Sequence, residues 1–178
     1  MEWLITNSPF IIVIVVLIWA IISAFKAGAI RTFGKIVSAV VSAVLVILIS
    51  FLVREYFYQE KLVMVLTIVL LFLLAVAFML FNTFFKPIKA LSHLSIVKLV
   101  DKPLGIVLAY FETVVLLWAV YCLIMVMNGG AIENWIMKCV ENNYIMRYYY
   151  NHNLLYDLIA GLGEKIMGHQ ILAKWILS

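Results

Sequence analysis

Residues 9–25 read PFIIVIVVLIWAIISAF, an apolar run without a charged side chain. Three further apolar runs follow, at residues 36–53, 62–85 and 104–127. Each has about the 17–25 residues that a helix needs to cross the hydrocarbon layer. Only helices or closed barrels satisfy their backbone groups in lipid, and these runs do not alternate as barrel strands would. The sequence therefore predicts an all-α membrane protein with four transmembrane helices.

The composition supports a lipid environment. Of the 178 residues, 67% are hydrophobic and 12% charged, with a mean hydropathy of +1.15. A soluble domain is about half apolar and a quarter charged. The net charge of +4 comes from bases in short segments between the runs. No basic stripe with interleaved aromatic residues exists for a nucleic-acid strand to stack on, so we expect no nucleic-acid partner.

The bases also predict the orientation, because Lys and Arg accumulate on the cytoplasmic side. They gather in residues 26–35 and 86–102, whereas residues 54–61 carry two bases and two acids. We therefore expect the two basic segments inside and both termini outside. The chain begins Met1-Glu2-Trp3 without a base before Lys26, unlike a signal peptide, so we expect the first helix to be retained. The bases of the two inner segments are Lys26, Arg31, Lys35, Lys86, Lys89, Lys98 and Lys102.

The chain changes character at Asn128-Gly129-Gly130, where turn residues end the fourth run. We divide it there into a transmembrane domain, residues 1–127, and an extracytoplasmic amphipathic helical tail, residues 128–178. We expect the tail helices to lie on the outer membrane surface, or else to pack onto the loops of the bundle. A second helical pattern runs from Leu155 to Ile166, and Tyr148, Tyr149 and Tyr150 suit the headgroup zone. The apolar face of the first tail helix comprises Ile132, Trp135, Ile136, Cys139 and Val140.

Glu112 is the most unusual residue of the transmembrane runs. It lies eight positions after Leu104, which places it about 12 Å into the hydrocarbon layer. A carboxylate there is costly and faces protein or a wet cavity. We weigh a structural hydrogen-bonding role, an ion or proton path, and a lipid-facing position in a thinned bilayer. Its candidate partners are Ser42, Ser38, Asn82 and Ser23, with Lys35 and Lys102 reaching inward from the boundary.

Small residues recur at every fourth position in three places, a spacing that lets membrane helices approach closely. The stripes are Ala20, Ala24 and Gly28; Gly34, Ser38 and Ser42; and Gly105, Ala109 and Thr113. Glu112 lies beside the third stripe, which predicts that it faces a helix interface.

Few residues suggest chemistry. Asp101 and Pro103 suit the start of the fourth helix, where an acid caps the first turn. The three histidines, His93, His152 and His169, lie on different segments without ligand spacing, so we expect no metal site. Cys122 and Cys139 form neither a disulfide framework nor a zinc motif. No catalytic motif or phosphate-binding loop is present, so we expect neither a cofactor nor enzymatic activity.

Two segments resemble the colicin V production protein (CvpA) family of bacterial membrane proteins. Members carry a Gly-aromatic-x-Arg cluster just after the first helix, and here that place reads Lys26-Ala27-Gly28-Ala29-Ile30-Arg31-Thr32. They later carry Asp-Arg-x-x-Gly followed by glycines four and eight positions on. The second segment here is Asp101-Lys102-Pro103-Leu104-Gly105, then Ala109 and Thr113. Lys102 thus replaces an arginine, and Ala109 and Thr113 replace glycines.

The resemblance implies an inner-membrane protein that is accessory to colicin or toxin production or secretion, or to envelope maintenance. We expect it to act by helix–helix association with other membrane proteins, within the lipid bilayer. The alternative is a small homo-oligomeric channel or transporter for ions, protons or solutes that uses Glu112.

Overall fold

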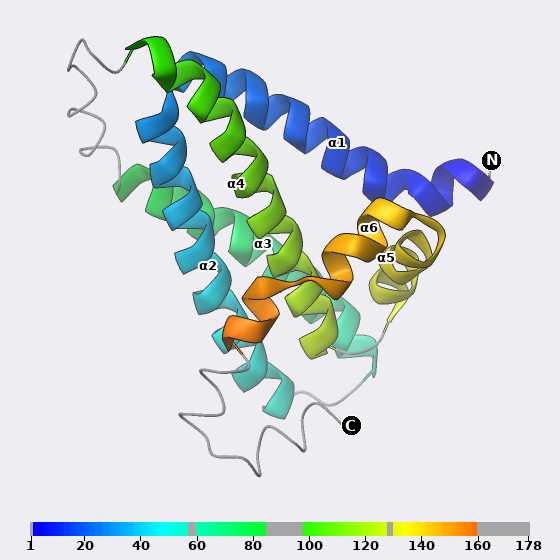
Figure 1. The fold of residues 1–178 in the computed structure, drawn as a ribbon. Helices are drawn as coiled ribbons and strands as arrows, with labels where there is room; N and C mark the ends of the chain where they lie inside the picture. Colours follow the sequence, from blue (N-terminus) through cyan, green and yellow to red (C-terminus); the bar gives the residue numbers. More distant parts are fainter. Residues whose placement is uncertain (1, 57–59, 85–97, 128–129, 160–178) are drawn as a thin grey trace.

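The computed structural model describes the backbone of residues 2–56, 60–84, 98–127 and 130–159, and the side chains of 6–50, 65–83, 101–127 and 130–159. The described residues form helices and contain no strand (Figure 1). A short helical segment, 154–159, follows the last of the six named helices. These six are α1 (Glu2–Ala27), α2 (Ala29–Tyr56), α3 (Glu60–Phe84), α4 (Lys98–Met127), α5 (Ala131–Asn142) and α6 (Tyr144–Asn151).

Four of these helices are long and apolar enough to cross a membrane, which confirms the predicted fold class. They are buried to very different extents. Only 11% of the most apolar window of α1 is buried inside the protein, against 50% of that of α4. An apolar helix that its own protein leaves uncovered requires lipid or another protein around it. The candidate spans are Thr6–Ala27, Ala29–Ser50, Val65–Thr83 and Asp101–Met127.

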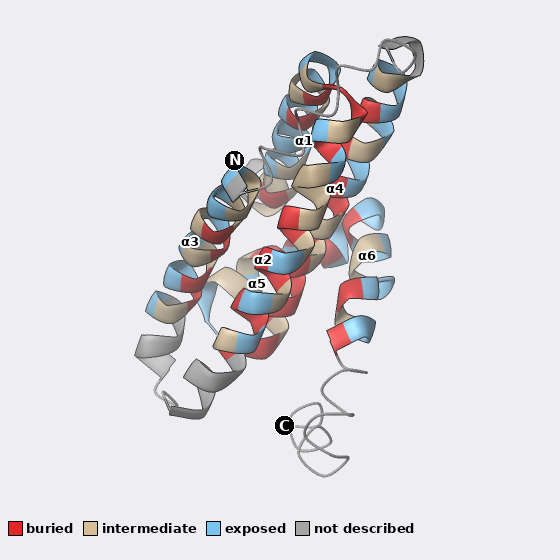
Figure 2. Ribbon diagram, turned by 90° about the vertical axis from the view of Figure 1, so that its left-hand side faces the viewer, coloured by how far each residue is buried: buried red, intermediate tan, exposed pale blue. Residues whose placement is uncertain are grey.

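α4 is the central helix of the bundle. It packs against both α2 and α1, and α2 also packs against α3. Buried residues lie on the sides of the helices that face one another (Figure 2). Where α1 and α4 cross, the contact is made by the small side chains of Ala20, Ala24 and Ala109. A larger apolar cluster joins α2, α3 and α4 and also takes in Leu155 and Ile159 from the C-terminal segment.

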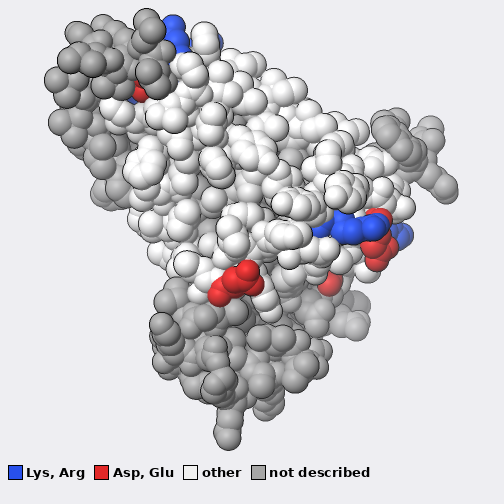
Figure 3. Space-filling view, viewed as in Figure 1, with Lys and Arg blue, Asp and Glu red and all other residues white. Residues whose placement is uncertain are grey.

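On one face of the bundle (Figure 3), the exposed charged side chains of the described residues lie toward the two ends. On the face drawn in Figure 3, charges gather around α5 and α6 and at the opposite end near the start of α4, with an uncharged band between them. Such a band matches the hydrocarbon layer, where exposed charge is costly.

The segment between the first two spans is shorter than predicted. We expected a basic loop at residues 26–35, but α1 ends at Ala27 and α2 begins at Ala29. Arg31 and Lys35 therefore lie on the first turns of α2. A single residue, Gly28, connects α1 to α2. The predictions for the following residues concern parts of the chain outside the described residues: Lys86, Lys89, His93, Leu162, Ile166 and His169.

α5 and α6 pack onto the spans α1 and α4. The indole Nε1 of Trp135 donates to Ser8 Oγ on α1 at 3.1 Å. The indole Nε1 of Trp118 donates to the carbonyl of Tyr149 at 3.0 Å. The amphipathic helices of the tail thus bury their apolar sides against helix faces of the bundle.

Local sequence explains the two tail helices. Gly130, with a φ of +112°, precedes α5, and the Oδ1 of Asn143 accepts from the backbone N–H groups of Ile145 and Met146 at 3.0 and 3.2 Å. An asparagine at this position caps a helix start. Ile136, Cys139 and Val140 are the buried residues of α5, as its predicted apolar face requires.

Candidate functional site

The connection between α1 and α2 depends on one glycine. Gly28 has a φ of +82°, in the left-handed region that glycine adopts without steric cost. Its N–H still donates to the Ala24 carbonyl of α1 at 2.7 Å, and its own carbonyl accepts from Thr32 of α2 at 3.2 Å. One residue thus ends one helix and starts the next.

Asp101 of α4 caps the start of α2. Its Oδ1 accepts the backbone N–H of Ala29 at 2.8 Å, across 72 residues of sequence. The first turn of α2, which is fully described, carries no acid of its own. The N-terminus of a helix has unpaired N–H groups and a partial positive charge, both of which a carboxylate stabilises. Asp101 supplies that group from a different helix.

The prediction that Asp101 caps the fourth helix is therefore wrong. α4 begins at Lys98, so Asp101 lies within its first turn and Pro103 lies inside the helix. An acid in the first turn still complements the dipole of α4. Its hydrogen bond, however, goes to the neighbouring helix, because the α1–α2 turn lies beside the start of α4 (Figure 1).

Two glycines allow this close approach. A Cβ on Gly28 would lie 1.9 Å from Oδ2 of Asp101. A Cβ on Gly105, one helical turn after Asp101, would lie 3.2 Å from the Ala24 carbonyl oxygen and 3.2 Å from the Gly28 carbonyl carbon. The structure thus brings Gly28, Asp101 and Gly105, which were quoted from the two sequence segments, into one contact. We call it the turn–cap site.

The remaining motif positions surround the turn–cap site. The Lys102 ammonium lies 5.1 Å from the centre of the Phe25 ring on α1, a favourable cation–π position. Arg31 is exposed. Ala109 is fully buried where α1 crosses α4, and the Thr113 hydroxyl donates to the Ala109 carbonyl at 3.0 Å.

Glu112 lies two turns beyond Gly105 on α4 and is 4% exposed. Among the described residues, its buried Oε2 has no hydrogen-bond partner. Lys35 of α2 interacts with it electrostatically, while the Lys35 Nζ donates to Ser23 Oγ of α1 at 3.0 Å. The lipid-facing placement of Glu112 is therefore wrong, because its side chain is buried inside the protein and Lys35 of α2 acts on it.

The other predicted partners do not bond to Glu112 in the described structure. The Ser42 hydroxyl donates to the Ser38 carbonyl at 2.6 Å, and the Ser38 hydroxyl donates to the Gly34 carbonyl at 2.8 Å. The Oδ1 of Asn82 on α3 is separately buried without a hydrogen-bond partner among the described residues. Of the predicted set, only Lys35 acts on Glu112.

The family model for the colicin V production protein matches residues 11–149. The chain belongs to that family. The match begins within the first span, covers the other three spans and α5, and ends within α6. No curated protein and no solved structure matches the chain. Together with the four apolar helices, the match makes this colicin V production family member an inner-membrane protein.

In this family member the small-residue stripes join its own helices. Ala20 and Ala24 of α1 meet Ala109 of α4, and Ser38 and Ser42 of α2 are fully buried. Close backbone approach at such positions strengthens helix packing in lipid. A contact with another membrane protein must therefore use different residues.

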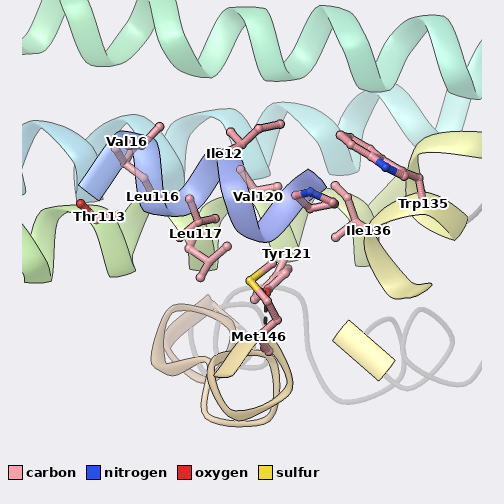
Figure 4. A pocket seen from close by; sticks show the side chains of 12 residues that line it. Ile12, Val16, Thr113, Leu116, Leu117, Val120, Tyr121, Trp135, Ile136 and Met146 are labelled. Atoms are coloured by element: carbon pink, nitrogen blue, oxygen red, sulfur yellow. Dashed lines mark hydrogen bonds between the residues drawn. The ribbon is translucent and has the colours of Figure 1, made fainter. Parts of the chain in front are cut away.

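The family member also has an apolar groove of about 220 Å³ between α1 and α4, closed by α5 and α6 (Figure 4). The polar groups on its walls are already bonded within the protein. The Tyr121 hydroxyl, for example, donates to the Met146 carbonyl at 3.3 Å. Glu112 does not line the groove, although its neighbour Thr113 does. The groove therefore offers no route by which an ion or proton could reach Glu112.

Sequence reasoning missed the contribution of Ala29, whose backbone N–H binds Asp101. The available signal was an absence: no Ser, Thr, Asp or Asn stands at residues 27–29, where a helix start needs a cap. It also missed the contact between Phe25 and Lys102. It missed Asn153 as well, whose Nδ2 donates to the Trp118 carbonyl at 3.2 Å. A hydrogen bond from a side-chain amide to a segment so distant in sequence leaves no sequence pattern.

Removing the acceptor of the turn–cap site should destabilise the protein measurably. We expect Asp101→Ala to cost about 0.5–2 kcal/mol, the range for a lost helix cap. Asp101→Asn keeps an acceptor oxygen and loses only the interaction of charge and dipole, so it should cost about 0.3–1 kcal/mol. Unfolding in mixed detergent micelles measures both values. Glu141→Ala, an exposed acid on α5, is the control, and equal costs for Asp101→Ala and Glu141→Ala would contradict the cap.

Proposed function

We propose that this protein is an accessory membrane protein in toxin or colicin production or secretion, or in envelope maintenance, and not an enzyme. It acts by associating through its helices with other membrane proteins. The observation that carries the proposal is the uncovered face of α1, which combines a tightly packed attachment to α4 with an exposed opposite side.

The uncovered face of α1 is entirely apolar over two turns. Val15 is 59% exposed, Trp19 68% and Ile22 51%. In lipid, helices associate through van der Waals packing and not through a hydrophobic driving force. A broad tryptophan with a polar N–H offers both packing area and a hydrogen bond to a partner helix. Trp19 is therefore the residue that we expect at the centre of a partner contact.

Photocrosslinking from α1 tests this proposal. We expect a photoreactive residue at Trp19 to capture a membrane protein in cells, while the same residue at Phe72 of α3, which is 70% exposed, captures lipid only. We expect Trp19→Ala to lower toxin secretion or detergent tolerance in a deletion strain, with protein abundance unchanged. Equal capture from both positions, or full complementation by Trp19→Ala, would count against a partner on α1.

We further propose that both termini lie outside the cytoplasm. The bases near the turn–cap site, Lys26, Arg31, Lys35 and Lys102, support this orientation. Alkaline phosphatase should be active when fused after Val53 or Met127 and inactive when fused after Lys89. The opposite pattern of activity would invert the orientation while leaving the helix packing unchanged.

A second candidate function is a homo-oligomeric channel or transporter, which the unpartnered Oε2 of Glu112 favours. Four helices rarely enclose a path alone, so the protein would have to assemble around this residue. Purified protein in liposomes should then pass ions or protons and lose that flux in Glu112→Gln. Protein that stays monomeric and passes neither would remove this candidate.

A further inference from the structure

We propose that Glu112, Lys35 and Ser23 form a proton-binding site in which Glu112 holds the proton and Lys35 changes partner when the proton leaves. The ligand is the proton itself. The inference applies whether the protein acts as an accessory partner or as a channel, because it concerns the occupancy of a buried carboxyl group and not a flux.

The surroundings of Glu112 do not support an ionised carboxylate. The side chain is 4% exposed within a candidate membrane span, and a buried charge needs a counter-charge or several donors. The buried Oε2 receives no hydrogen bond from the described residues. A neutral carboxylic acid is the form that tolerates such a position at lower cost.

The hydroxyl groups of Ser38, Ser42 and Thr113 donate to carbonyls of their own helices and not to Glu112. Ser38, Ser42 and Thr113 each donate their single hydroxyl hydrogen to a backbone carbonyl four residues earlier, at 2.8, 2.6 and 3.0 Å. A hydroxyl has one donor hydrogen and two acceptor lone pairs. These groups therefore retain the capacity to accept a hydrogen bond from a protonated acid but not to donate one to a carboxylate.

Lys35 is the charge that acts on Glu112 within the described structure. The other titratable groups on the described elements around α4 include His152, Tyr156 and Asp157 after α6, and α3 carries none over residues 65–83. On α1 and α2 these groups are Lys26 and Arg31, both exposed; on α4, Asp101, Lys102, Tyr110, Tyr121 and Cys122; on α5, Glu133, Lys138, Cys139 and Glu141; and on α6, Tyr144, Arg147, Tyr148, Tyr149 and Tyr150.

Lys35 has two alternative partners. In the structure its ammonium group donates to Ser23 Oγ at 3.0 Å and so links α2 to α1. Loss of the proton leaves a carboxylate on α4, and the ammonium group then has a stronger partner there than a neutral hydroxyl. Release of one proton to water thus transfers the Lys35 bond from α1 to α4, which connects the protonation of Glu112 to the attachment of α1.

Infrared spectroscopy of the protein in liposomes tests the site. We expect the wild type at pH 7 to show the carbonyl stretch of a protonated carboxylic acid, and Glu112→Gln to lack it. Lys35→Met removes the counter-charge, so the band should persist to a higher pH. Ser23→Ala frees Lys35, so the band should disappear at a lower pH. Lys26→Met, an exposed cation at the same end of α1, should leave it unchanged.

Labelling of the wild type keeps the proposal testable if a variant fails to fold. A hydrophobic carbodiimide reacts with protonated buried carboxyl groups, and mass mapping of native membranes should place the adduct on Glu112 at pH 7. Absence of both the band and the adduct would overturn the proton site. A band that responds equally to Lys35→Met and Lys26→Met would overturn the exchange of partners.

Discussion

Replacing Gly28 by alanine is expected to lower the free energy of unfolding by about 1.5–4 kcal/mol, from two separate causes. A residue with a side chain loses about 1–2 kcal/mol in the left-handed region, which the φ of +82° requires. The new Cβ also lies 1.9 Å from Oδ2 of Asp101, which displaces the carboxylate and removes a cap worth about 0.5–2 kcal/mol.

A double-mutant cycle separates these causes. Asp101→Ala removes the oxygen that the Gly28→Ala methyl group strikes, so the double variant should be less destabilised than the sum of the two single variants. Gly130→Ala is the matched control, because Gly130 has a φ of +112° but nothing within 4 Å of an added Cβ. Its cost should be that of backbone strain alone. Strict additivity in the cycle would mean that Gly28 and Asp101 do not meet.

Replacing Gly105 by leucine should cost about 3 kcal/mol or more, because the side chain would enter a tightly packed contact. The atoms that face Gly105 belong to the backbone of Ala24, Gly28 and Ala29, so no side-chain rotation relieves the overlap. α4 must move away from the α1–α2 turn, and the Asp101 bond to Ala29 breaks with it.

The size of the inserted side chain distinguishes this effect from a change in helix propensity. Gly105→Ala gains about 1 kcal/mol of helix propensity, which offsets a small overlap at 3.2 Å, so its net effect should be near zero. Ala75→Leu, at an exposed position of α3, should be neutral. Unfolding in mixed micelles measures all three variants, and a neutral Gly105→Leu would show that α4 does not approach the turn so closely.

The sequence was sufficient to predict the four spans, and its two motif segments contain the residues that meet at the turn–cap site. Length and hydropathy determine whether a helix can cross a membrane, and both are local properties. The family motif drew attention to Gly28, Asp101 and Gly105 for the same reason, since each is recognisable within a few residues. Glu112 was recognisable because a lone carboxylate in an apolar run conflicts with its surroundings.

The partners of these residues could not be predicted, because they depend on tertiary packing. Asp101 stands where an acid would cap its own helix, yet it caps α2, since α4 begins earlier than its proline suggests. Ser42 was expected at Glu112, but its hydroxyl has an acceptor one turn away in its own backbone. The tail helices pack on α1 and α4 through contacts such as Trp135 with Ser8, 127 residues apart.

The bond between Asp101 and Ala29 also bears on the order in which the protein is assembled. The ribosome releases α1, the turn and α2 well before residue 101 exists, so the amide at the start of α2 must first find water or lipid headgroups as its partner. Only when α4 enters the membrane does that amide exchange its temporary partner for the carboxylate. A nascent chain that stops after α3 therefore lacks the carboxylate that completes the start of α2.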